Sequence, residues 1–101
     1  MLRHLVLLKF KPEAMAAQVD AVVQAFVDLP AQIGEVKSLE WGADVSPEGL
    51  GKGFTHCFVL GFDDTRGRDA YLPHPAHQAF VAQLQPVLAD VLVVDYEPPR
   101  A

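Results

Sequence analysis

Hydrophobic and polar residues alternate near the start of the chain. Because successive side chains of a strand point to opposite sides, this two-residue repeat predicts a strand over residues 4–11. One face of this strand would be mixed, since Leu5 and Leu7 share it with Lys9 and Lys11. The face toward the core would hold an apolar set led by a histidine: His4, Val6, Leu8 and Phe10.

Two later segments show the same repeat, over residues 36–43 and 54–62. In the first, Leu39 and Trp41 would lie on one side of the strand. Residues 44–53 between them hold three glycines and a proline, which predicts a loop. A last strand is predicted over residues 91–96. The apolar face of segment 54–62 is again led by a histidine: His56, Phe58, Leu60 and Phe62.

Apolar residues recur at helical spacing in the remaining stretches. Pro12 suits the first position of a helix, which Pro30 and Gly34 would end. A short helix is predicted from residues 63–65 to about Tyr71, and a second helical piece from Pro75. The buried face of the first helix would hold Met15, Val19, Val22, Val23 and Phe26. That of the last piece would hold His77, Phe80, Val81, Leu84 and Leu88.

The order strand, helix, strand, strand, helix, strand indicates an α+β fold. It is typical of the ferredoxin-like βαββαβ sandwich, a four-stranded antiparallel sheet with helices on one face. The length of 101 residues predicts one domain over residues 1–101. The uncovered face would be partly apolar, with Leu5, Leu7, Cys57 and Val59 on it. Because exposed apolar sheet faces mark interaction sites, we expect a second copy to cover it, in a homodimer.

Composition narrows the classes of function. Half of the residues are hydrophobic and 21% are charged, so the chain should bury a core rather than stay disordered. The net charge of −5 argues against nucleic acid and anionic membranes as partners, since both need basic patches. No segment resembles a membrane span or a secretion signal, which makes the cytoplasm the expected location. Cys57 is the single cysteine, so an intrachain disulfide is impossible.

The histidines are the candidates for chemistry. His77 should point inward, and burial favours a neutral imidazole that can act as a general base. Tyr71 and His74 precede it at three-residue spacing. His4 and His56 would lie at the rim of the same interior. The alternative for each is a structural histidine held by a hydrogen bond. The apolar residues expected to line a pocket with them are Val6, Leu8, Phe26, Phe80, Val81 and Leu84.

Signals for metals and cofactors are missing. The sequence holds no HExxH pattern and no clear set of two histidines and a carboxylate, although His74 and Asp95 could approach one another in space. Gly49, Gly51 and Gly53 precede a strand rather than a helix, unlike the glycines of nucleotide-binding loops. We therefore expect neither a metal nor a cofactor.

The chain resembles the stress-responsive dimeric α/β-barrel (Dabb) family over nearly its whole length. The resemblance lies in residues 4–11, 41–45, 54–56, 71–77 and 94–96, and Tyr-Leu-Pro-His-Pro-Ala-His is the most specific part. It implies a ferredoxin-like protomer and a dimer in which two sheets form a barrel.

Within that family the sequence is similar to a plant polyketide cyclase that works without a cofactor. This similarity implies that His77 is a general base and that Tyr71 orients a carbonyl group. It also implies that His4 and His56 belong to the pocket.

Three functions fit these observations. The first is a cofactor-free acid–base enzyme, similar to a cyclase, acting on a small apolar carbonyl compound. The second is a non-catalytic stress-response module or a module that binds a small apolar ligand. The third, by analogy of fold alone, is a cofactor-free monooxygenase.

Overall fold

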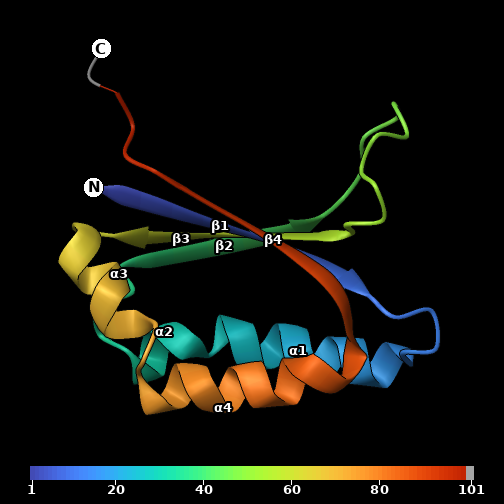
Figure 1. Cartoon of the computed structure of the whole chain (residues 1–101), viewed down its shortest axis with the longest axis horizontal. Coiled ribbons are helices and arrows are strands. Elements are labelled where there is room, and N and C mark those ends of the chain that lie inside the picture. Colours follow the sequence, from blue (N-terminus) through green and yellow to red (C-terminus); the bar gives the residue numbers. More distant parts are fainter. Residues whose placement is uncertain (100–101) are drawn as a thin grey trace.

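Four strands form one antiparallel sheet, and the helices pack on a single face of it (Figure 1). The computed structural model describes residues 1–99, so the last two residues of the expected domain lie outside the described part. The order of the elements confirms the predicted βαββαβ arrangement. The elements are β1 (Leu2–Phe10), α1 (Ala16–Val27), α2 (Leu29–Gln32), β2 (Ser38–Ala43), β3 (His56–Phe62), α3 (Thr65–Tyr71), α4 (Pro75–Leu84), a 3₁₀ turn (Gln85–Val87) and β4 (Leu88–Tyr96).

The sheet has the strand order β2-β3-β1-β4, and every neighbouring pair is antiparallel. Strand β1 therefore lies inside the sheet, while β2 and β4 form its edges. The register places His4 of β1 opposite Leu60 of β3 on one side and opposite Asp95 of β4 on the other. Directly opposed residues share a face of the sheet, so His4 and Asp95 both point toward the helices.

The core lies between the sheet and the helices. The rings of Phe26 from α1 and Phe58 from β3 stack with centroids 4.1 Å apart, and Phe80 from α4 lies 4.7 Å from Phe26. Leu8 and Leu60 are fully buried beside them. These residues come from the faces that the alternation and the helical spacing predict. None of the helices in residues 1–99 combines the length and apolarity needed to cross a membrane.

The first helix begins later than the sequence predicts. Pro12 lies in a turn, and α1 starts at Ala16 with Met15 as its N-cap. The side-chain oxygen of Gln18 accepts a hydrogen bond from the backbone N–H of Met15 at 2.9 Å, which fixes this start. Met15 is consequently 64% exposed and does not belong to the buried helix face.

The other boundaries also shift. Pro30 does not end the first helix but lies in the first turn of α2. Proline is tolerated there because an N–H in the first turn has no partner within the helix. Leu88, predicted on a helix, begins β4, because a 3₁₀ turn around Pro86 ends the helical run. β4 thus starts three residues before Val91, whereas β2 and β3 each start two residues later than predicted.

The second face of the sheet has no helix over it (Figure 1). Leu5 and Leu7 of β1 lie on this open face opposite Val94 and Leu92 of β4, which are 48% and 46% exposed. The β2–β3 connection, residues 44–55, and the segment after β4 both extend on this side (Figure 1). The open face is therefore an apolar surface, and the β2–β3 connection and the segment after β4 project beside it.

The aromatic stack at Phe58 should dominate the stability of the fold. Replacing this fully buried ring by alanine should lower the free energy of unfolding by about 3–5 kcal/mol, because it leaves a cavity against Phe26. Urea unfolding followed by far-UV circular dichroism measures the change. Val45→Ala, at a side chain that is 92% exposed, is the control and should change it by less than about 0.5 kcal/mol. A similar small loss in Phe58→Ala would contradict this assignment of the core.

Candidate active site

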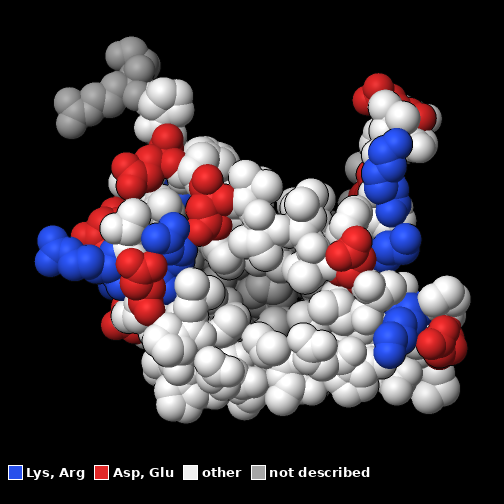
Figure 2. Space-filling view, viewed as in Figure 1, with Lys and Arg blue, Asp and Glu red and all other residues white. Residues whose placement is uncertain are grey.

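A cavity of about 490 Å³ lies between the sheet and helices α3 and α4, beside the edge strand β4. Figure 2 shows the surface hollowed between the sheet and the helices, with mostly uncharged residues around the hollow. Val91 and Val93 of β4 line it and remain 42% and 50% exposed, although they point to the helical side. The helices thus leave part of this edge strand uncovered, and that gap is the cavity.

The cavity has a polar end and an apolar end. His4 and Asp95 form one opposed pair of the sheet, and Val6 and Val93 form the next pair along the same two strands. Gln85, after the last turn of α4, is a polar lining residue outside the first level. The other polar lining residues belong to the first level: His4, Arg68, Asp69, Tyr71, His77 and Asp95. The apolar lining continues from the second level: Val6, Phe26, Phe80, Val81, Leu84, Leu88, Val91 and Val93. A ligand with a polar head and an apolar remainder suits this division.

His77 enters the cavity from the first turn of α4, which Pro75 begins. Its Nδ1 lies 2.9 Å from the carbonyl oxygen of Leu72, in the turn between α3 and α4. A carbonyl only accepts, so Nδ1–H donates, and the neutral ring keeps its basic lone pair on Nε2. Within residues 1–99, Nε2 makes no hydrogen bond.

The pKa of His77 is lowered from its ordinary value. Burial is the largest cause, the hydrogen bond to Leu72 opposes it, and the charge of His4 adds to it. The ring is therefore neutral at pH 7, which is the form that can accept a proton.

Tyr71 ends α3 and lies between the two cavity histidines. Its ring centroid is 4.4 Å from that of His77 and 6.0 Å from that of His4, and the residue is 1% exposed. Burial raises the pKa of Tyr71 far above its ordinary value, so the phenol stays protonated at neutral pH. Its hydroxyl has no hydrogen-bond partner in residues 1–99, which leaves it able to donate to a ligand.

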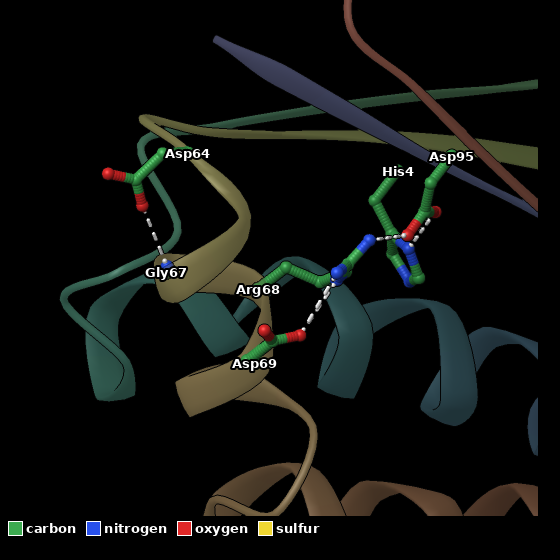
Figure 3. A network of polar contacts seen from close by, with 6 residues as sticks. All are labelled: His4, Asp64, Gly67, Arg68, Asp69 and Asp95. Carbon is green, nitrogen blue, oxygen red and sulfur yellow. Dashed lines mark hydrogen bonds and ion pairs between the residues drawn. The ribbon is translucent and has the colours of Figure 1, made fainter.

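His4 belongs to a chain of polar side chains (Figure 3). Its Nδ1 lies 2.5 Å from Oδ1 of Asp95, and Oδ2 of Asp95 accepts a hydrogen bond from Nη1 of Arg68 at 3.0 Å. The remaining nitrogens of Arg68 contact Oδ1 of Asp69 at 3.0 and 3.1 Å. His4 is 5% exposed, so this chain reaches from the surface into the core.

Three residues predicted for the pocket lie outside this cavity. His74 caps α4, because its Nδ1 accepts a hydrogen bond from the backbone N–H of Ala76 at 3.0 Å. His56 lies at the other end of β3, where its ring stacks on Trp41 with centroids 5.7 Å apart. Burial lowers its pKa, and Asp20 partly opposes that effect. Leu8 is buried completely by its neighbours.

The cavity also holds residues that the sequence pattern does not predict for the site. Asp95 contacts His4, whereas the sequence left open an approach to His74. A signal existed, because Asp95 falls on the same strand face as Val91 and Val93 and is thus a carboxylate at an inward position. Arg68 lies three residues before Tyr71 on α3, hence on the same side of that helix. Within residues 1–99 no three His, Cys, Asp or Glu side chains gather as a metal site would require.

The sheet, the one-sided helices and the cavity between them define a ferredoxin-like α+β protein. Residues 2–98 match the family described as Stress responsive A/B Barrel Domain (Dabb), and the chain belongs to this family. The family resemblance seen in the sequence is thereby confirmed.

Individual relatives cover nearly the whole chain. It is 33% identical over 96 residues to the stress-response A/B barrel domain-containing protein HS1 of Arabidopsis thaliana, spanning 95% of this chain and 88% of that protein. It is 32% identical over 96 residues to olivetolic acid cyclase of Cannabis sativa, spanning 95% of each. A solved dimeric ferredoxin-like protein of unknown function from Thermobifida fusca has a TM-score of 0.80 and 33% identity, over 94% of this chain and 88% of that one.

The lowered pKa of His77 should be visible in solution. An NMR titration of the ring protons should give a midpoint below 6.5. The pKa of such a histidine is lower in the folded than in the unfolded state. Its contribution to the free energy of unfolding is therefore lost as pH falls below the pKa of the unfolded state. The melting temperature should therefore drop between about pH 7 and about pH 5.5 less steeply in His77→Gln than in the wild type. Equal slopes, or a midpoint above 6.5, would contradict burial of a neutral ring.

Proposed function

We propose that this protein is a cofactor-free acid–base catalyst that acts on a small carbonyl compound with an apolar remainder. The observation that carries the proposal is the hydrogen bond from Nδ1–H of His77 to the carbonyl of Leu72. It leaves the basic Nε2 of a neutral imidazole in a largely apolar cavity, on a ring whose centroid is 4.4 Å from that of Tyr71. The relative named olivetolic acid cyclase supports a cyclase-like reaction.

His77 is the general base of the proposed reaction. Its Nε2 removes a proton from a carbon between two carbonyl groups, which is the most acidic type of carbon–hydrogen bond in such a substrate. The electron pair moves onto a carbonyl oxygen and forms an enolate. The Tyr71 hydroxyl donates a hydrogen bond to that oxygen, and such a donor is most effective where water is excluded.

The apolar end of the cavity binds the rest of the substrate. Phe26, Phe80 and Leu84 are buried side chains on its helical wall, and Val6 and Val93 form its floor on the sheet. Burial of an alkyl chain there contributes roughly 25 cal/mol for each Å² removed from water. The polar head is thereby held near His77 and Tyr71.

The protomer is proposed to act as a homodimer that pairs through the open face of the sheet. Exposed apolar side chains on this face need a cover, as noted for Leu92 and Val94. A depression of about 440 Å³ between Leu7, Cys57 and the β2–β3 connection gives the face a shape that a partner can fill. The relative from Thermobifida fusca is described as dimeric.

A non-catalytic role is the second candidate. The apolar lining that suits a substrate suits a stored or sensed apolar ligand equally well, and HS1 is named only as a stress-response protein. In that case ligands would raise the melting temperature, and loss of His77 would leave binding largely intact.

Deuterium exchange separates the two candidates. A soluble β-ketothioester is mixed with the protein in heavy water, and entry of deuterium at the acidic carbon is followed by NMR. Wild-type protein should accelerate the exchange, and His77→Ala should reduce that acceleration roughly 100-fold because the base is lost. Tyr71→Phe should reduce it by a similar factor through the lost donor.

The matched control is Gln78→Ala, which truncates the next residue of the same helix at an exposed position outside the cavity. It should exchange deuterium like the wild type. Absence of acceleration by wild-type protein across compounds of several lengths would contradict catalysis, and a rise in melting temperature with the same compounds would then favour the binding role.

Dimerisation is tested by placing a charge on the open face. Leu92→Asp should convert a dimer into a monomer in analytical ultracentrifugation, since burying a carboxylate against an apolar partner is unfavourable. Ala17→Asp, at an exposed position of α1 on the helical side, should leave the dimer intact. A monomeric wild type would contradict the dimer, and a dimeric Leu92→Asp would contradict its location.

A further inference from the structure

The carboxylate of Asp95 is shared between two side chains of different elements. Oδ1 contacts Nδ1 of His4 on β1, and Oδ2 accepts the hydrogen bond from Arg68 on α3. The side chain of Asp95 is only 22% exposed, so neither oxygen is free to turn toward solvent. Arg68 in turn is held by Asp69. The orientation of Asp95 is consequently fixed from both sides.

This arrangement determines which ring nitrogen of His4 carries the proton. An ionised carboxylate can only accept hydrogen bonds, so Nδ1 of His4 must carry the proton that it shares with Asp95. Nε2 is then the ring nitrogen that can exchange protons with a ligand. Figure 3 shows it directed away from Asp95, toward the helices. His4 lines the cavity, so Nε2 and the substrate region lie on the same side of the sheet.

In both cavity histidines Nδ1 is bound by the protein and Nε2 is left for a ligand, but the partners of the two Nδ1 atoms differ. Nδ1 of His77 is held by a neutral carbonyl, whereas Nδ1 of His4 is held by a carboxylate. A carboxylate balances the charge of an imidazolium, which a carbonyl does less effectively. The rings come from opposite walls, with Tyr71 between them at 6.0 and 4.4 Å. The geometry therefore favours a donor on the sheet side and a base on the helix side.

We propose that His4 is a second proton-transfer residue of the cavity and that Asp95, clamped by Arg68, is its positioning residue. This inference rests on the proposed function, because it assigns the step that follows proton removal by His77. The other groups that face His4 are Tyr71 from α3 and His77 from α4, and Asp69 reaches it only through Arg68.

The assigned step completes a carbon–carbon bond formation. The enolate carbon attacks a second carbonyl carbon of the same substrate, and a new carbon–carbon bond forms. The electron pair of that carbonyl moves to its oxygen. Nε2–H of the His4 imidazolium gives its proton to this oxygen, which yields a hydroxyl group and neutral His4. Solvent then returns a proton to His4 and removes one from His77, so the cycle is redox-neutral and consumes nothing else.

The positioning role is tested without any substrate. In Asp95→Asn, Arg68 still needs an acceptor and takes the amide oxygen, so the amide NH₂ faces Nδ1 of His4 and forces the ring proton onto Nε2. Nitrogen NMR of the histidine rings, recorded at a pH at which His4 is neutral in both proteins, should show the proton on Nδ1 in the wild type and on Nε2 in Asp95→Asn. The same tautomer in both proteins would overturn the positioning role.

Asp69→Asn is the matched control for this measurement. It removes a carboxylate from the same arginine but leaves the contact between His4 and Asp95 in place. It should keep the wild-type tautomer. A change of tautomer there would indicate a general charge effect rather than positioning by Asp95, and would overturn the assignment.

The catalytic part is tested with a linear triketone whose acidic carbon can close a six-membered ring on the distal carbonyl. Asp95→Asn and His4→Ala should slow ring closure roughly 10- to 100-fold, and should slow it more than they slow deuterium exchange at the acidic carbon, which depends on His77 and Tyr71. Equal ring closure in Asp95→Asn and the wild type would overturn the inference. If wild-type protein exchanges no deuterium, the proposed function fails, whereas the tautomer measurement still decides the role of Asp95.

Discussion

Each side chain of the central strand β1 must point either to the helices or to the open face, because an extended chain repeats every two residues. That constraint places His4 among the buried apolar residues Val6 and Leu8. Antiparallel pairing with β4 then places Asp95 at the same level and on the same face. A shift of one residue in this register would move Asp95 to the other face of the sheet and remove the polar end of the cavity.

The cavity exists because the helices do not cover the whole sheet. Phe26 stacks on Phe58 of β3 and Phe80 packs against Phe26, while β4 at the edge keeps Val91 and Val93 partly exposed. The uncovered edge is thus a gap in the packing, and it is the proposed site for a ligand. Binding sites in small domains commonly lie where packing is incomplete, since a fully packed core has no room for a substrate.

The polar end joins two electrostatic environments within one cavity. On the helical side, burial keeps His77 neutral, although its hydrogen bond to the carbonyl of Leu72 opposes this effect. On the sheet side, the carboxylate of Asp95 and the guanidinium of Arg68 form a charged chain that reaches solvent through Asp69. The ring of Tyr71 lies between the two histidines, and burial keeps its hydroxyl protonated. Acid–base chemistry uses such a difference between neighbouring groups, because one group must accept a proton while another donates one.

Local periodicity in the sequence predicts the four strands, the main helices and most of their inward faces, although it misplaces the start of α1 and the side chain of Met15. The pattern therefore predicts that His4, Tyr71, His77 and the apolar residues around Phe80 face the same interior. Which histidines lie close together depends on the packing of the elements. His74 caps α4 and contacts the backbone, and His56 lies at the far end of β3, beside Trp41. The partnership of Asp95 with His4 and Arg68 joins residues 91 and 27 positions apart. Such a contact depends on strand order and register, which no local pattern of residues determines.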